Sequence, residues 1–404
     1  MKSQFDEMTR GLAQSVARRA PLANFRFGLA LALLCLGLAP TRLLADPLDH
    51  WVSRTSGTSN GLTSIAYVNN QFVTVGSAGT ILTSPYGSTW TTRAPDTNVN
   101  LYSVAYGNNL FVAGANGGNG SSPMILTSPD GTTWRTSTLG ANLVRGLAFG
   151  NGQFVFVTGR YGHSDGVGGP IYFASYAIYT SPNGTNWTLR TSGSGGILLG
   201  ITYGNNQFAA VGTQGLIVTS TDGSNWTRQI SGTTNDLRGI TYGNNEYVAV
   251  GAHGQVLTSP DGVTWTGNIA GSGDFSGIAY GNNTFVAAGT AIFSSPDGMT
   301  WTQRASQGGN AIAYGNKSFA VVGAGGTILQ FSLPPELGPV KLLSSGAAQV
   351  TMTAPAGQTY AIQASTNLND WLTITNVALA NVSGQFADPA ARNFSKRFYR
   401  VVNN

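Results

Sequence analysis

The sequence predicts an all-β protein built from repeated four-stranded units, and two patterns carry the prediction. Seven units contain an aromatic residue, at 67, 106, 149, 203, 242, 280 and 314, with a second aromatic five residues later. Tryptophan recurs at the end of the units, at 51, 90, 134, 187, 226, 265 and 301. A period of about 40 residues with four short strands is typical of a β-propeller, so we predict a seven-bladed β-propeller.

Within one unit, residues 242–265, each segment has a physical reason. Tyr-Gly-Asn-Asn supplies residues that accept the positive φ of a tight hairpin. An apolar run follows, then a Gly-bounded loop, a second apolar run and the turn Ser-Pro-Asp-Gly before Trp265. Pro presets φ in that turn and Gly takes its left-handed position. We therefore expect four strands of about five residues in each unit.

The two ends of the repeat region predict how the ring closes. The seventh unit stops after its third strand, at 326–329, whereas residues 51–54 form a fourth strand without the first three. Joined together, these pieces complete the last blade and leave no open sheet edge. We predict a ring closed by an N-terminal strand.

The first 45 residues are predicted to be a signal peptide. Arg10, Arg18, Arg19 and Arg26 precede the apolar segment 27–39, and Ala45 offers a cleavage site. That segment is shorter than the roughly 20 residues needed to cross a bilayer. We expect a secreted, periplasmic or cell-surface protein with no transmembrane span in the mature chain. An uncleaved anchor is the alternative.

The composition excludes several classes of function. The leader holds six of the 21 Lys and Arg and two of the 16 Asp and Glu, so residues 46–404 carry 15 basic and 14 acidic residues. This balance gives no support to nucleic-acid binding. The only cysteine, Cys35, lies in the leader, so we expect no disulfide framework. The three histidines lie apart with no recurring ligand spacing, and we predict no metal and no cofactor.

The second turn of the unit carries a resemblance to a known family. Residues 128–134, 259–265 and 295–301, together with 220–226, in which Thr221 replaces Pro, resemble the Asp-box, or BNR, repeat. This repeat occurs in propellers of sialidases, other glycoside hydrolases, sortilin-type receptors and photosystem assembly factors. The resemblance covers roughly residues 50–332. The spacing from Asp to Trp is one residue shorter than usual, and Asn183 and Tyr86 replace the Asp in two copies.

In that family the Asp-box is a structural turn on the face away from the ligand. The resemblance therefore implies structural roles for Asp130, Trp134, Asp222, Trp226, Asp261, Trp265, Asp297 and Trp301.

The last part of the chain is a separate region. Residues 333–339 are predicted to be a linker because they are rich in Pro and Gly. Strand-like runs at 349–353, 359–364, 371–376 and 397–402 predict a small β-sandwich-like domain over 340–404, following a propeller domain over 46–332. Residues 360–371, 386–389 and 397–401 resemble a C-terminal module of secreted proteins of the Verrucomicrobia type. For this module we expect a spacer, surface-attachment or sorting role.

The candidate ligand site lies on the face opposite the two turn signals. The third unit has a long insertion on that face, and binding residues concentrate in loops on a rigid scaffold. Arg145, Arg238 and Tyr102 each lie four residues before the aromatic of their unit and are expected at the channel mouth. No catalytic residue is assigned. The candidate ligand-binding residues are Tyr102, Arg145, Arg160, Tyr161, His163, Asp165, Tyr172, Tyr176, Asp236, Arg238, His253 and Asp274.

These features favour an exported, non-catalytic β-propeller that binds an extracellular or envelope protein, or a glycan, through this face. A sialidase-like or other glycoside hydrolase is one alternative, and it requires facing carboxylates or an arginine cluster with Tyr and Glu. Carboxylates are scarce on this face: Asp165, Asp236 and Asp274. An envelope assembly or structural factor is the other alternative, from the resemblance to photosystem assembly propellers.

Overall fold

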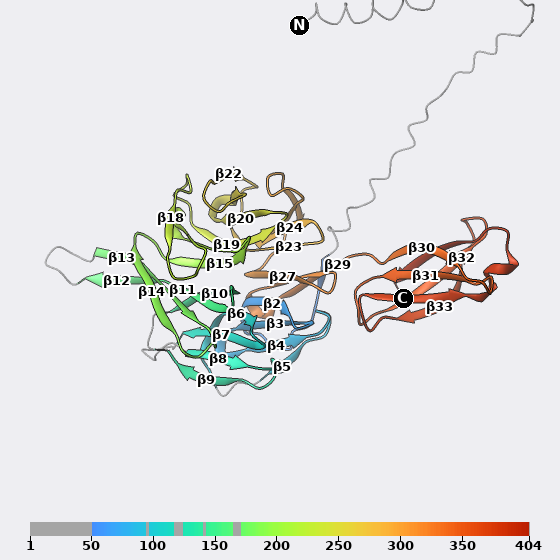
Figure 1. The fold of residues 1–404 in the computed structure, drawn as a ribbon, viewed down its shortest axis with the longest axis horizontal. Coiled ribbons are helices and arrows are strands. Elements are labelled where there is room, and N and C mark those ends of the chain that lie inside the picture. Colours follow the sequence, from blue (N-terminus) through green and yellow to red (C-terminus); the bar gives the residue numbers. More distant parts are fainter. Residues whose placement is uncertain (1–50, 94–96, 117–123, 140–142, 165–170, 404) are drawn as a thin grey trace, which may run out of the picture. The chain divides into compact units, whose positions relative to one another are not determined.

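A computed structural model describes residues 51–93, 97–116, 124–139, 143–164 and 171–403. The predicted signal peptide and Asp165 lie outside these residues. The described chain is all-β, with short 3₁₀ turns between strands (Figure 1). The all-β prediction is therefore confirmed.

Between Val52 and Ser332 the described strands form seven antiparallel sheets, six of four strands and one of five. The first three sheets in chain order contain β2 (Leu62–Val68), β3 (Gln71–Gly76), β4 (Ile81–Ser84) and β5 (Thr91–Arg93); β6 (Asn100–Gly107), β7 (Leu110–Asn116), β8 (Met124–Ser128) and β9 (Arg135–Thr138); β10 (Val144–Gly150), β11 (Gln153–Thr158), β12 (Arg160–Ser164), β13 (Ile171–Ser181) and β14 (Thr188–Ser194).

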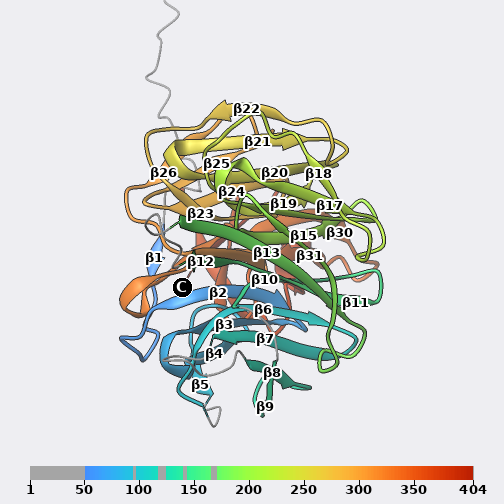
Figure 2. The same cartoon turned by 90° about the vertical axis from the view of Figure 1, so that its left-hand side faces the viewer.

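The next three contain β15 (Leu198–Gly204), β16 (Gln207–Gly212), β17 (Ile217–Ser220) and β18 (Thr227–Gln229); β19 (Leu237–Gly243), β20 (Glu246–Gly251), β21 (Gln255–Ser259) and β22 (Thr266–Ile269); β23 (Phe275–Gly281), β24 (Thr284–Gly289), β25 (Ile292–Ser295) and β26 (Thr302–Ala305). The last contains β27 (Ala311–Gly315), β28 (Ser318–Val322), β29 (Ile328–Ser332) and β1 (Val52–Ser53). Figure 2 shows successive sheets following one another from β2 to β26.

The first hairpin of each sheet has the expected chemistry. Asn244 and Asn245 have φ of 51° and 60°, which suits a two-residue hairpin turn. The turn places Tyr242 opposite Tyr247, and their ring centroids are 4.8 Å apart. Equivalent aromatic pairs occupy the same place in the other six sheets.

The Gly of Tyr-Gly-Asn-Asn is required by the contact between neighbouring sheets. A Cβ atom on Gly243 would overlap the ring of Tyr280, the aromatic residue of the next sheet. Gly107, Gly150, Gly204, Gly281 and Gly315 are covered by an aromatic ring in the same way. In the last of these contacts, Gly315 packs against Tyr67 of the first sheet. The innermost strands neighbour one another in the order β2, β6, β10, β15, β19, β23, β27 and again β2, which is the arrangement of a β-propeller.

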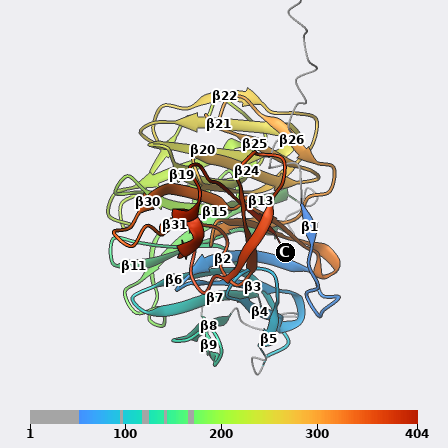
Figure 3. The ribbon, with the colours of Figure 1, turned by 90° about the vertical axis from the view of Figure 1, so that its right-hand side faces the viewer.

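One sheet joins the two ends of this region. β1 pairs with β29, Val52 lying opposite Gln330 and Ser53 opposite Leu329. The Arg54 N–H donates to the Ile328 carbonyl at 2.9 Å, and Arg54 Nε donates to Gln330 Oε1 at 2.9 Å. Figure 3 shows β1 at the side of the molecule near β26.

The C-terminal region contains two three-stranded sheets with a shared core. The strand order of one sheet is β30 (Glu336–Leu342), β31 (Ala348–Thr353), β34 (Ser383–Asp388). The order of the other is β33 (Leu372–Ala378), β32 (Thr359–Ser365), β35 (Phe398–Asn403). A 3₁₀ turn, η6 (Pro389–Asn393), follows β34. Val350 and Phe386 of one sheet pack with Tyr360 and Ile362 of the other. The structure differs from the predicted linker 333–339, because β30 begins at Glu336, which pairs with Thr353.

Candidate functional site

A cavity of about 230 Å³ lies where the innermost strands meet. The residue four places before each aromatic ring lies at its mouth or beside it. In six sheets this residue falls where the pairing of the innermost strand shifts register, as between Leu237 and Gly239, and such bulges re-aim side chains. The seven residues are Thr63, Tyr102, Arg145, Leu199, Arg238, Ser276 and Asn310. The sequence-based prediction included only Tyr102, Arg145 and Arg238. The other four residues share their register position and could have been identified in the same way.

Arg145 is the unsatisfied cation of this mouth. Its guanidinium carbon lies 5.8 Å from the ring centroid of Tyr102, close enough for a cation–π contact. Arg145 Nε is buried and has no hydrogen-bond partner among the described residues. No carboxylate of the described chain forms a salt bridge with this arginine. A buried donor without a partner costs free energy, so the site suits an incoming anion.

Arg238, in contrast, is already paired. Its Nη1 lies 2.9 Å from Asp274 Oδ2, and both side chains are more than 30% exposed, at 33% and 40%. Asp274 Oδ1 also accepts the His253 backbone N–H at 2.9 Å. Two hydrogen bonds hold the pKa of Asp274 below its usual range: the bond from the His253 N–H contributes most, and the bond from Arg238 contributes next. The structure therefore brings together three predicted residues, Arg238, His253 and Asp274.

Asp236 and Asp274 share a structural task. Asp236 Oδ1 accepts the N–H of Gln214 at 3.0 Å, as Asp274 does for His253. Gln214 and His253 both have φ of 56°, a conformation that the carboxylates stabilise in the 3₁₀ turns η3 (Thr213–Gly215) and η4 (Ala252–Gly254). This turn-capping role is a simpler account of Asp236 than ligand binding.

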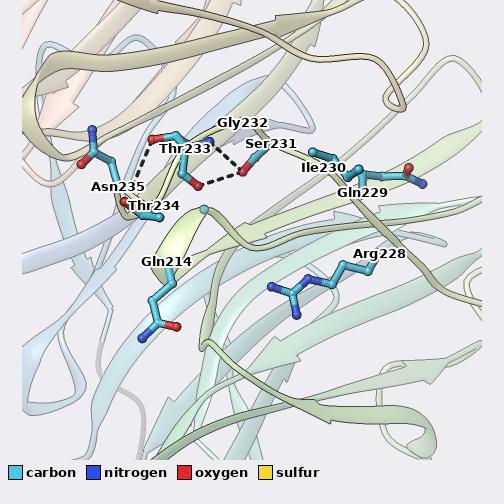
Figure 4. Close-up of a pocket in the computed structure, with 10 residues that line it drawn as sticks. Gln214, Arg228, Gln229, Ile230, Ser231, Gly232, Thr233, Thr234 and Asn235 are labelled. Atoms are coloured by element: carbon cyan, nitrogen blue, oxygen red, sulfur yellow. Dashed lines mark hydrogen bonds between the residues drawn. The ribbon is translucent and has the colours of Figure 1, made fainter.

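Two hollows extend this face beyond the central cavity. A groove of about 580 Å³ is lined by Arg238 and Asp274 and shares Ser276 and Asn310 with the cavity, so the two are continuous. A second hollow, of about 590 Å³, is lined by Gln214, Arg228, Ile230 and the residues around Thr233 (Figure 4). Ile230 is 88% exposed there, and Arg228 has no carboxylate partner among the described residues.

The long insertion of the third unit forms a hairpin rather than part of the cavity mouth. β12 pairs with β13, so that Tyr161 lies opposite Ala174 and His163 opposite Tyr172 along the backbone. Arg160 is exposed, and Tyr176 packs against the core of the neighbouring sheets. Figure 1 shows this hairpin projecting away from the innermost strands. Arg160 and Tyr176, whose side chains are described, do not line the cavity.

The predicted Asp-box residues lie in the tight turns that join the third and fourth strands of their sheets, as between β8 and β9. In the turn at Asp130, Oδ1 accepts the N–H groups of Thr132 and Thr133 at 2.8 and 2.9 Å, and Trp134 Nε1 donates to the Gly131 carbonyl at 3.1 Å. The turns at Asp222, Asp261 and Asp297 repeat this pattern with Trp226, Trp265 and Trp301.

These turns alter the acidity of their carboxyl groups. The Thr133 backbone N–H, which makes the largest contribution, and the hydrogen bonds of Thr132 hold the pKa of Asp130 well below its usual range. The Asn225 N–H has the same effect on the pKa of Asp222. Because the carboxylates are occupied by their own backbone, the geometry suits a structural role.

The described residues show neither a metal-binding cluster nor a membrane-spanning helix. They contain no group of three or more His, Cys, Asp or Glu side chains able to hold a metal ion. None of their helical segments is long and apolar enough to cross a membrane.

Comparison with known proteins identifies the fold. No protein-family model and no curated protein matches the sequence. A solved structure of YCF48 bound to D1 peptide superposes with a TM-score of 0.56 at 19% identity, over 72% of this chain and 97% of that chain. YCF48 from Cyanidioschyzon merolae gives 0.53 at 20% identity, over 70% and 98%. The WD40 β-propeller domain of Doa1 gives 0.53 at 13% identity, over 70% and 97%. At these identities the likeness shows the fold alone, and that fold is a β-propeller.

Proposed function

We propose that this chain is a non-catalytic β-propeller that binds an acidic segment of a protein partner at the cavity mouth and in the adjoining groove. The observation that carries the proposal is Arg145, whose buried Nε has no partner among the described residues. A carboxylate of the partner would pair with the guanidinium of Arg145 and complete an ion pair in a partly desolvated site.

The shape of the face supports a peptide rather than a compact small molecule. The cavity continues into a groove through Ser276 and Asn310, which suits an extended chain crossing from one to the other. The superposed YCF48 structure was solved with a bound D1 peptide, so a protein of similar fold binds a peptide.

The test uses Arg145→Gln and the full chain. Peptide arrays would compare segments rich in Asp and Glu with the same segments carrying Asn and Gln. We expect wild type to prefer the acidic peptides and Arg145→Gln to lose roughly 10-fold in affinity, as for a charge-assisted hydrogen bond. Arg135→Gln is the matched control, because Arg135 is an exposed arginine of β9, away from the cavity. Equal affinity for acidic and amidated peptides would refute the proposal.

The glycan alternative is tested on a polysaccharide array. A variant in which residues 160–176 are replaced by a short Gly-Thr-Gln-Gly loop should keep any peptide binding, since β12 and β13 project away from the innermost strands (Figure 1). Glycan binding that disappears in that variant would favour a sugar-binding function instead. The hydrolase alternative gains nothing from Asp236 and Asp274, because each already accepts a backbone N–H.

We further propose that the seven sheets are blades of one closed ring of Asp-box repeats, in which β1 completes the last blade. The pairing of β1 with β29 and the contact of Gly315 with Tyr67 support closure. Deleting residues 51–54 should lower the melting temperature markedly, because it exposes the edge of β29. An unchanged melting temperature would argue against closure by this strand.

Export completes the proposal: the chain is secreted, periplasmic or held at the cell surface after cleavage near Ala45. The basic and apolar order of residues 10–39 supports it. Mass spectrometry of protein recovered from the cell exterior and periplasm should find an N-terminus near residue 46. Recovery of the intact chain only from the cytoplasm would contradict export.

A further inference from the structure

The C-terminal region contains one more turn of the propeller type, at 365–371. Ser365 Oγ accepts the Leu368 N–H at 2.9 Å, and Asn367 Oδ1 accepts the N–H groups of Asn369 and Asp370, both at 2.9 Å. Trp371 Nε1 donates to the Leu368 carbonyl at 3.0 Å. The turn thus repeats the hydrogen bonds found around Asp130.

Its tip differs from every propeller copy. The equivalent residues of the propeller turns are Gly87, Gly131, Gly184, Gly223, Gly262 and Gly298, with φ between 70° and 78°. Here the residue is Leu368, with φ of 67° and a side chain that is 55% exposed. A side chain is strained in this conformation, and an exposed leucine gains nothing from packing. The turn chemistry therefore does not explain Leu368, and strain of this kind is often kept for a function.

Other exposed apolar side chains gather at the same end of this region. β30 ends at Leu342 and β33 begins at Leu372, which are 73% and 69% exposed. Tyr399 Oη donates to Asp388 Oδ2 at 2.9 Å and joins the two sheets at this end. Phe394, between η6 and β35, is 43% exposed. We call this end, with Leu342, Leu368, Leu372 and Phe394, the apolar tip.

Positive charge surrounds the apolar tip. Lys341, Arg392 and Lys396 are exposed and have no carboxylate partner among the described residues. Arg400 lies 4.3 Å from the ring centroid of Trp371. Of the acidic groups nearby, Asp388 is buried against Arg397, and Asp370 accepts from Asn367 Nδ2. The tip therefore combines separate protruding apolar side chains with excess cations.

We propose that the apolar tip inserts into the surface of an anionic lipid bilayer. Apolar side chains beside lysine and arginine are the pattern of interfacial membrane binding, where cations meet lipid phosphates. A fitted protein interface is less suited, because such interfaces are depleted in lysine and need a continuous complementary surface. The four apolar side chains instead come from separate turns and strand ends.

The experiment is co-sedimentation of the full chain with vesicles of phosphatidylcholine and phosphatidylglycerol, beside vesicles of phosphatidylcholine alone. We expect binding to the anionic vesicles that weakens as salt is added. Leu368→Gly should reduce this binding about 10-fold, because it removes a leucine that would insert into the bilayer, while the melting temperature stays the same or rises. The double variant Arg392→Gln with Lys396→Gln should also bind the anionic vesicles about 10-fold more weakly, because it loses the attraction of two cations to the anionic lipids.

Ile230→Asn is the matched control, because it removes an exposed isoleucine from the propeller and should leave vesicle binding unchanged. Every variant keeps the same N-terminal residues, so any lipid binding by those residues contributes equally to all variants. Equal binding of wild type, Leu368→Gly and the double variant would overturn the proposal. Failure of wild type to bind anionic vesicles would also overturn it and turn attention to an acidic protein surface.

Discussion

The two ends of each innermost strand follow different rules. At one end, six of the seven sheets place a glycine under an aromatic ring of the next sheet, Val68 being the exception. At the other end, the equivalent residues are Thr, Tyr, Arg, Leu, Arg, Ser and Asn. The first end is fixed by packing between sheets, whereas the second faces a cavity where packing imposes no single residue. Variation at that second end is thus where recognition can be built.

The largest effect should come from the packed end. Gly243→Ala puts a Cβ into the ring of Tyr280, so we expect a loss of about 3 kcal/mol in the free energy of unfolding. Urea denaturation measures it. Gly267→Ala is the control, because the nearest atom to its Cβ, Leu257 Cδ2, is 3.4 Å away. Similar losses in both variants would show that the contact between sheets is not the cause.

A smaller, stabilising effect is expected at Glu246, the first residue of β20 and thus of the second strand in its sheet. Gln71, Gln153 and Gln207 donate from Nε2 to the carbonyls of Asp130, Asp222 and Asp261 in other sheets. Glu246 occupies the equivalent position near Gly298. An ionised carboxylate cannot donate this hydrogen bond.

We therefore predict that Glu246→Gln raises the free energy of unfolding by about 1 kcal/mol at pH 7. Burial, chiefly, raises the pKa of Glu246. The folded protein therefore disfavours the ionised form of Glu246. This loss of stability disappears at pH values below the pKa of the unfolded chain, about 4.3. The gain of the variant should shrink as pH falls through this range. A gain that is the same at pH 7 and near pH 4 would contradict this account.

The Asp turns should give the next effect, visible in acid. The lowered pKa of Asp130 means that its carboxylate stabilises the fold above the unfolded value of about 3.9 and loses this contribution as pH falls toward its folded value. Asp130→Asn should therefore flatten the decline of stability between pH 5 and about pH 3, by less than about 1 kcal/mol because the turn is exposed to solvent.

The natural turn at Asn183 shows that an amide can hold this geometry. Its Oδ1 accepts the N–H groups of Thr185 and Asn186 at 3.1 and 3.0 Å. Asn183→Asp is the reverse test and should steepen the acid decline. Unchanged acid profiles in both variants would remove the carboxylate from the explanation.

The smallest effect on stability is expected at the cavity mouth. Arg145→Gln should change the free energy of unfolding by less than about 0.5 kcal/mol, because the substitution leaves no former hydrogen-bond partner of Arg145 unpaired. Thermal denaturation of the variant used for peptide binding checks this. A loss comparable to that of Gly243→Ala would mean that Arg145 is a packing residue, and the two ends would no longer differ.

Part of the candidate site followed from sequence and part did not. The register four residues before the aromatic can be counted in the sequence, and the residues it selects, Tyr102, Arg145 and Arg238, line the cavity or its groove. The insertion of the third unit was a weaker guide, because composition does not say whether a polar segment folds over a cavity or pairs with itself as β12 and β13 do. The start of β30 inside the expected linker has a similar origin, since its pairing partner Thr353 is remote in sequence.

The sequence alone determined the features that depend on local geometry and period: strands, tight turns, the aromatic pairs and the repeated unit. These follow from backbone φ preferences and from side chains five residues apart across one hairpin. Only the tertiary structure decided which charges are satisfied. Asp274 neutralises Arg238 from the next sheet, while Arg145 is left with an aromatic ring. That difference depends on distances between separate strands, which no local pattern contains.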